Sequence, residues 1–129
     1  MRGNKAFTSK DRSLKKLLVE GADDANVCYH LLRSHNIPIK ERDTQKANDN
    51  GIEIIDIKGI ENLLKSLPRQ IQADSGASLG IVVDADEDIT GRWQSLRDIV
   101  LKAGYSTTPT DPDLEGTIIH ESDQPIIGI

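Results

Sequence analysis

Apolar residues recur along the chain in two patterns: short continuous runs, and longer stretches with a spacing of three or four. The runs predict strands, because blocks of about four to eight aliphatic residues favour extended backbone; they are Leu14–Val19, Ile52–Gly59 and Leu79–Asp86. The spaced stretches predict helices, and they lie within 25–35, 60–76 and 93–103. Strands therefore alternate with helices, which is typical of an open, mostly parallel α/β sheet with helices on both faces.

Cap and breaker residues refine these boundaries. Asp23 or Asp24 is expected to cap the first helix, and Asp88 or Thr90 the last. Pro68 is expected to kink or restart the second helix, because proline lacks the amide hydrogen that a helix interior uses. The third apolar run is the most continuous, as expected of a central parallel strand that is covered on both faces.

Two more short apolar pieces follow a turn-rich segment at 107–116. They are Thr117–His120 and Pro125–Ile129, and both predict strands. The chain ends inside the second piece, so its outer edge is expected to be unpaired near Ile126–Ile129. An unpaired edge accepts a strand from another chain, and we therefore expect a homodimer or a completing partner chain.

Composition bounds the class of protein. The 129 residues, 36% hydrophobic and 29% charged, fit one soluble domain, which we place at 14–129. No apolar run approaches the roughly 18 residues of a membrane span, and no signal peptide opens the chain, so no membrane partner is expected. The single cysteine, Cys28, fits a reducing compartment, and we expect a cytoplasmic protein.

Charge gives a mixed indication of partners. The net charge of −5 supplies no general attraction to nucleic acid. The segment 1–13 is basic, and it is interpreted either as a frayed, solvated terminus or as a contact for phosphates.

Acidic residues follow two of the predicted strands. Glu20 comes directly after the first, while Asp84 and Asp86 end the third with a spacing that puts both carboxylates on one side of an extended chain. Ligands of open α/β sheets lie beyond the carboxyl ends of the strands, and carboxylates are the ligands that Mg²⁺ or Mn²⁺ prefers. The competing interpretation is a solvated turn and helix cap at Asp86–Asp88.

The runs LLVEGADD (Leu17–Asp24) and IVVDADED (Ile81–Asp88) resemble the TOPRIM domains of topoisomerases, primases and OLD-family nucleases. Within that superfamily, residues 14–129 resemble the TOPRIM-related group DUF3226. The resemblance implies that Glu20 is a general acid or base and that Asp84 and Asp86 bind Mg²⁺.

The same resemblance extends to neighbouring positions. Gly21 is expected to allow a tight turn beside the glutamate, and Lys58-Gly59 is expected at the end of the second strand, where Lys58 either contacts a phosphate or is solvated. Relatives in the group continue past the last strand, which implies that this chain is truncated on its C-terminal side.

The implied function is Mg²⁺-dependent phosphodiester chemistry on nucleic acid, of a nuclease-like, hydrolytic kind. The alternative from another class is a non-catalytic TOPRIM-like module that binds metal or a partner. A phosphoacceptor receiver domain is a third interpretation, and it expects a lysine after a fifth strand that the sequence does not supply.

Overall fold

The computed structural model describes residues 15–40, 51–73, 78–84 and 88–129. Within these residues, five strands form one sheet in the order β2-β1-β3-β5-β4. The strands are β1 (Lys15–Val19), β2 (Glu53–Asp56), β3 (Ser78–Val82), β4 (Ile118–Ile119) and β5 (Ile126–Gly128). The helices are α2 (Ala22–Ser34), α3 (Ile60–Ala73) and α4 (Ile89–Lys102). The predicted basic segment 1–13 and Asp86 lie outside the described residues.

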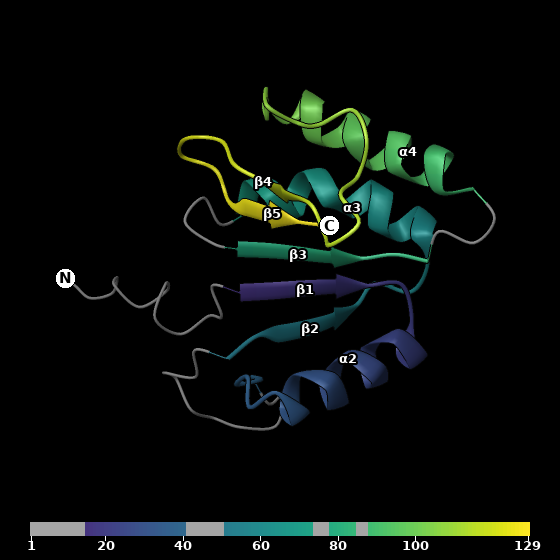
Figure 1. Ribbon diagram of the computed structural model, residues 1–129, viewed down its shortest axis with the longest axis vertical. Helices are drawn as coiled ribbons and strands as arrows, with labels where there is room; N and C mark the ends of the chain where they lie inside the picture. Colours follow the sequence, from purple (N-terminus) through teal and green to yellow (C-terminus); the bar gives the residue numbers. More distant parts are fainter. Residues whose placement is uncertain (1–14, 41–50, 74–77, 85–87) are drawn as a thin grey trace.

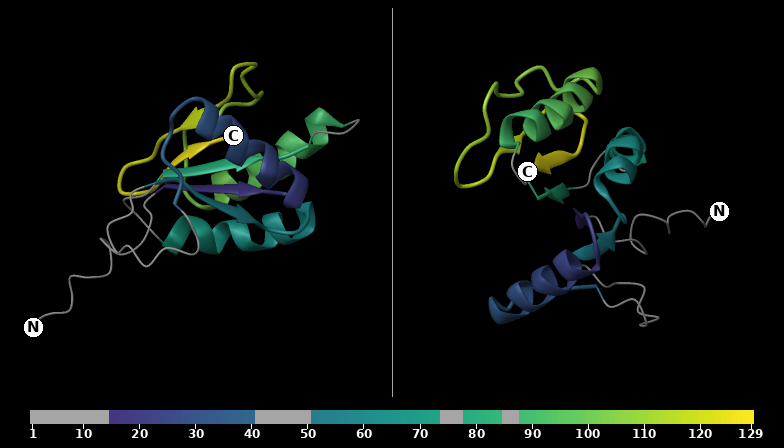
Figure 2. Two further views of the ribbon diagram at one scale, coloured as in Figure 1. Left: turned by 90° about the horizontal axis from the view of Figure 1, so that it is seen from below. Right: turned by 90° about the vertical axis from the view of Figure 1, so that its right-hand side faces the viewer.

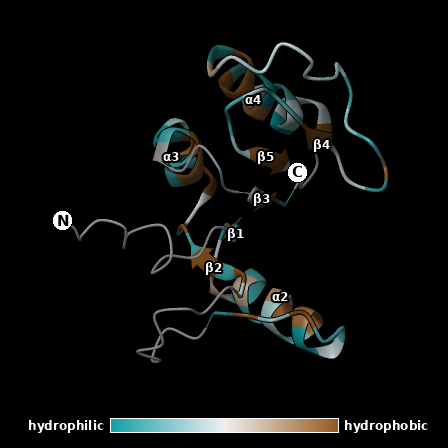
Figure 3. Ribbon diagram, turned by 90° about the vertical axis from the view of Figure 1, so that its left-hand side faces the viewer, coloured by the Kyte–Doolittle hydropathy of each residue, from teal (hydrophilic) through white to brown (hydrophobic). Residues whose placement is uncertain are grey.

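The strand pairing is parallel throughout except at β4, which runs antiparallel to β5. Helix α2 lies on one face of the sheet, and α3 and α4 lie together on the other (Figures 1 and 3). The view along the strands in Figure 2 shows the same two layers. The predicted open, mostly parallel α/β architecture is therefore confirmed.

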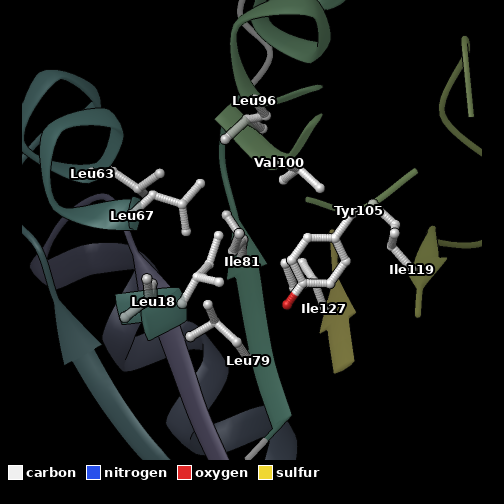
Figure 4. Close-up of a cluster of buried hydrophobic side chains, with 11 residues drawn as sticks. Leu18, Leu63, Leu67, Leu79, Ile81, Leu96, Val100, Tyr105, Ile119 and Ile127 are labelled. Atoms are coloured by element: carbon white, nitrogen blue, oxygen red, sulfur yellow. The ribbon is translucent and has the colours of Figure 1, made fainter. Parts of the chain in front are cut away.

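The hydrophobic core lies between the sheet and the α3/α4 layer (Figure 4). Alternate residues of the strands point to this face, and they meet one stripe from each helix. The buried side chains are Leu18, Leu79, Ile81, Ile119 and Ile127 from the sheet, Leu63, Leu67 and Ile71 from α3, Leu96 and Val100 from α4, and Tyr105 from the segment after α4. Aliphatic packing on this face is thus the main source of stability.

Among the described residues, the opposite face is only half covered by helix. Helix α2 contacts β2 and β1, and it buries none of its own side chains completely. Val82 of β3 is 40% exposed and Ile118 of β4 is 64% exposed. The expectation that the third strand is covered on both faces was wrong, because a continuous apolar run cannot tell whether a helix lies over each side of it.

The predicted edge pairing at Ile126–Ile129 is also wrong. Strand β5 lies inside the sheet, with β3 on one side and β4 on the other. Hydrogen bonds between Thr117 and Ile129 extend the β4–β5 pairing, with N–O distances of 2.8 and 2.9 Å. The sheet ends at β2 and β4 instead.

The helix boundaries agree with the sequence at some positions and differ at others. Asp88 caps α4, as predicted, with its Oδ1 accepting a hydrogen bond from the Gly91 amide at 2.8 Å. The cap of α2 is Gly21, without a side-chain hydrogen bond, so the prediction of Asp23 or Asp24 was wrong. Both acids lie in the first turn, where carboxylates favour the helix dipole.

Helix α3 runs from Ile60 to Ala73 with Pro68 inside it, so the helix does not restart there. Pro68 is exposed, and its ring removes one amide donor from the helix. In the part of the chain that the structure describes, no helix is long and apolar enough to cross a membrane.

A buried tyrosine fixes the segment after α4. Tyr105 is 0% exposed, and its hydroxyl donates to the Pro125 carbonyl at 2.7 Å. Burial, and then the negative charge of Glu121, raise the pKa of Tyr105 to about 12. The neutral phenol is therefore the form that the fold stabilises.

We expect replacement of a core leucine to cost far more than replacement of an exposed one. Leu63→Ala should lower the free energy of unfolding by about 2–5 kcal/mol, because it leaves a cavity under α3. Leu114 is fully exposed, so Leu114→Ala should change it by less than about 0.5 kcal/mol. Urea unfolding followed by circular dichroism measures both, and equal losses would contradict this assignment of the core.

Tyr105 should make stability fall at alkaline pH. Its folded-state pKa of about 12 lies above the ordinary value of 10.0, so its contribution is complete below pH 10 and is lost as the pH rises through 12. Tyr105→Phe keeps the ring and removes the titrating hydroxyl. From pH 9 to pH 12, the free energy of unfolding should therefore fall more steeply with pH in the wild type than in Tyr105→Phe. Parallel pH dependences would show that this phenol does not couple to folding.

Candidate functional site at the carboxyl edge of the sheet

The ends of β1, β2 and β3 lie level with one another. Val19 is paired with Asp56 on one side and with Val82 on the other, so the residues that follow these strands emerge together. Glu20 follows β1 and Asp84 follows β3 by two residues. The shared edge predicted from the sequence therefore contains both acids.

Glu20 connects the three strand ends. Its Oε1 accepts a hydrogen bond from the Asp84 amide at 2.8 Å, across a sequence separation of 64 residues. Its backbone carbonyl accepts from the Gly59 amide at 2.6 Å, on the β2 side. Glu20 is partly buried and Asp84 is exposed, so the carboxylate of Glu20 is held in position at the rim of the sheet.

The turn from β2 into α3 has an unusual backbone. Lys58 and Gly59 both have positive φ, at 63° and 116°. Asp56 Oδ1 accepts from the Lys58 amide at 2.9 Å, and Asn62 Nδ2 donates to the Lys58 carbonyl at 2.9 Å. These bonds hold a left-handed turn that glycine adopts without strain.

Asp56 is a residue of this edge that the sequence analysis missed. The sequence does contain a signal for this role: Asp56 lies two residues before Lys58-Gly59. At that spacing an aspartate carboxylate can accept a hydrogen bond from the backbone amide two residues later. The turn leaves a shallow depression of about 370 Å³ lined by Lys58, Gly59, Ile60, Glu61 and Asn62. Lys58 is exposed in this lining, two residues before α3 begins.

Gly21 does not use the conformational freedom of glycine. Its φ of −157° is extended backbone, and a Cβ at this position would meet no atom within 4 Å. The bend between β1 and α2 is therefore open to other small residues. Gly59, in contrast, sits where a side chain would be strained.

Cysteine and histidine do not enlarge the site. Burial, and then the charge of Asp24, raise the pKa of the Cys28 thiol, so the thiolate is disfavoured. His30, His35 and His120 are exposed and lie outside this edge.

Two of the three predicted acids are therefore brought together by the structure. The described residues contain no group of three or more His, Cys, Asp or Glu side chains that could hold a metal ion, and Asp86 lies outside them. Two carboxylates suffice as protein ligands for Mg²⁺, which completes its octahedron with waters and substrate phosphates. The donor chemistry of Glu20 and Asp84 thus fits a hard divalent cation.

Comparison with known proteins identifies a family for the chain. Residues 14–129 match the family described as "Protein of unknown function (DUF3226)". The chain belongs to DUF3226. No curated protein and no solved structure matches it. The DUF3226 match includes every strand and helix described above, and the link to TOPRIM domains stays a resemblance carried by the acidic motifs.

The two glycines of the edge should respond differently to alanine. Gly59→Ala should lower the free energy of unfolding by about 1–3 kcal/mol, because φ is 116° there. Gly21→Ala is the matched control, and its effect should stay within about 0.5 kcal/mol, since a poorer cap offsets a less flexible unfolded chain. Denaturant unfolding measures both variants. A tolerated Gly59→Ala would show that the turn is not held in the left-handed region.

Proposed function

We propose that the carboxyl edge of this DUF3226 protein carries out Mg²⁺- or Mn²⁺-dependent phosphodiester chemistry on nucleic acid, with nuclease-like hydrolysis as the reaction. The observation that carries the proposal is the 2.8 Å hydrogen bond from the Asp84 amide to Glu20 Oε1. It fixes the direction of one carboxylate beside the end of the third strand, where the DxD motif begins. A preoriented carboxylate at a strand end is what proton transfer to a bound substrate requires.

Glu20 is the residue for proton transfer. A carboxylate has two oxygens, and the hydrogen bond to Oε1 leaves the group able to take up a proton on the other. The Gly59 amide holds the backbone of Glu20 at the same time. The side chain therefore loses little conformational freedom when it acts, which favours catalysis over a mobile surface glutamate.

Asp84 and Glu20 would hold the cation, with Asp86 as the further ligand that the sequence predicts. A bound Mg²⁺ supplies positive charge at the scissile phosphate and lowers the pKa of a bound water. Lys58, exposed at the neighbouring turn, would contact a phosphate of the same strand of nucleic acid. The bound cation and Lys58 would supply positive charge locally, whereas the net charge of −5 supplies no general attraction to a phosphate backbone.

A non-catalytic, metal-binding or interaction module is the second candidate. The observation that favours it is the half-covered face of the sheet, where apolar side chains such as Ile118 and Ile126 remain exposed. Such a surface suits a module that assembles with another chain. The two functions differ in whether bound metal is accompanied by cleavage.

Calorimetric titration with Mg²⁺ and Mn²⁺ should show binding that weakens at least tenfold in Asp84→Asn. Single- and double-stranded DNA and RNA, labelled and incubated with each protein, should be cleaved by the wild type. Glu20→Gln should lower that cleavage about 10²–10⁴-fold with the fold intact, because it removes the proton-transfer group. Asp86→Asn tests the third ligand in the same titration.

Asp98→Asn is the matched control, since it removes one exposed carboxylate from α4. Equal metal affinity in the wild type, Asp84→Asn and Asp98→Asn would overturn the site. Binding that is lost in Asp84→Asn, with no cleavage by any of the proteins, would support the non-catalytic module instead.

A further inference from the structure

Helix α3 turns a polar stripe away from the sheet. Its buried side chains, such as Leu63 and Leu67, face the core. On the other side of the helix, Asn62, Lys65 and Arg69 are exposed, and their spacings of three and four residues place them next to one another. In Figures 2 and 3 no coloured element lies outside α3 on the side away from the sheet. The stripe is therefore open to a ligand.

The charge of this stripe is positive. Lys65 and Arg69 are its two charged members. The acid of α3, Glu61, is seven residues before Pro68 and so lies in line with it, two turns away on the same flank. Pro68 lines a groove shared with Ile99 of α4, so this flank is the one that borders α4. The stripe itself thus presents cations without a carboxylate between them.

The stripe begins at the candidate site. Asn62 Nδ2 donates to the Lys58 carbonyl at 2.9 Å, so the first residue of the stripe is bonded to the turn before the helix. The next residue of that turn, Gly59, donates its amide to the Glu20 carbonyl at 2.6 Å. A continuous row of bonded residues therefore leads from the acidic edge, past the exposed Lys58, onto the outer side of α3.

The other half of the same edge is acidic. The turn before β4 lies at the carboxyl edge, because Thr117 bonds to Ile129, which follows β5 and is level with Ile81 of β3. This turn carries three exposed acids, Asp111, Asp113 and Glu115. Residues 103–129 contain five acids and no lysine or arginine. A polyanion at the edge is therefore repelled on the β4 side and attracted on the α3 side.

We propose that the outer side of α3 binds the backbone of a nucleic acid strand that extends from the acidic edge. The inference rests on the proposed function, because the strand starts at the cation held by Glu20 and Asp84. Lys58 contacts the first phosphate beyond the site, and Lys65 and Arg69 contact phosphates further along. Such contacts fix the direction of the strand and supply affinity, but they read no base sequence.

The length of the stripe suits a short piece of backbone. From Asn62 to Arg69 the helix rises by about 10 Å, at roughly 1.5 Å per residue. One strand of a double helix rises by about 3.4 Å per nucleotide, so the stripe spans about three nucleotides. A guanidinium can bind a phosphate through two hydrogen bonds, which makes Arg69 the stronger of the two contacts.

Fluorescence anisotropy of short, labelled single-stranded DNA and RNA, titrated with the whole chain in Mg²⁺, tests this surface. Lys65→Ala and Arg69→Ala should each weaken binding about threefold, and the double variant about tenfold. The plot of log affinity against log salt should become shallower by about 0.7 for each lost phosphate contact on a single strand. Lys65→Arg should bind as the wild type does, because it keeps the charge.

Arg33→Ala is the matched control for Arg69→Ala. It also removes an exposed arginine from a helix, but from α2, on the opposite face of the sheet. It should change the affinity by less than about twofold and leave the salt dependence unchanged. Circular dichroism checks that each variant is folded.

The probe is sized on a gel after each titration, so that cleavage is scored separately from binding. Binding that depends on Lys65 and Arg69, without cleavage, would support this surface and refute hydrolysis. Cleavage or binding that is unchanged in the double variant, or that falls equally in Arg33→Ala, would overturn this surface alone. A wild type that binds neither DNA nor RNA would overturn both proposals.

Discussion

The described structure depends on how its three helices are divided between the two faces of one mostly parallel sheet. Backbone groups of parallel strands are satisfied by their neighbours, but both faces of such a sheet need apolar cover. In the described part of the chain, α3 and α4 pack on one face and α2 on the other. The two-helix side forms a closed aliphatic core around Leu18 and Ile81, whereas the one-helix side leaves β3, β5 and β4 exposed.

The same division separates the acidic edge, at the strand ends, from the exposed apolar part of the sheet. The acidic edge lies at the carboxyl ends of β1 and β3, where strand register brings Glu20 and Asp84 together. The exposed apolar half lies on a face of the sheet rather than at its edge. The acidic edge and the exposed apolar face around Ile118 and Ile126 are therefore separate surfaces of the molecule.

Much of the fold could be predicted from the sequence, because apolar periodicity reports directly on strands and helices. The run Leu79–Asp86 was predicted as a strand, and β3 occupies Ser78–Val82; Asp88, one of the two predicted caps, is the cap of α4. What failed depends on contacts between elements far apart in the chain. The exposure of Val82 follows from the absence of a helix over it in the described residues, and the inner position of β5 follows from β4 pairing beyond it.

For the candidate site, the sequence predicted the positions of the acidic residues but not the bonds between them. The positions of Glu20 and Asp84 follow from strand ends alone, but their connection runs through the backbone amide of Asp84, which no residue type reveals. Asp56 was missed because its carboxylate serves the Lys58 turn, a local bond hidden inside an apparently continuous strand. Gly59 was predicted at the end of the second strand, and its positive φ of 116° shows why a glycine stands there.

The two hydrogen bonds of Glu20 couple the edge to three strands of the sheet, β1, β2 and β3. Its side chain is bound to the end of β3 and its carbonyl to the turn after β2, so the site exists only while three strands keep their register. Opening of any one of these strands would disrupt the site. A ligand that binds at the edge would therefore stabilise β1, β2 and β3 together. Ligand occupancy at the edge and amide hydrogen exchange in β1, β2 and β3 therefore report on the same equilibrium, the opening of these strands.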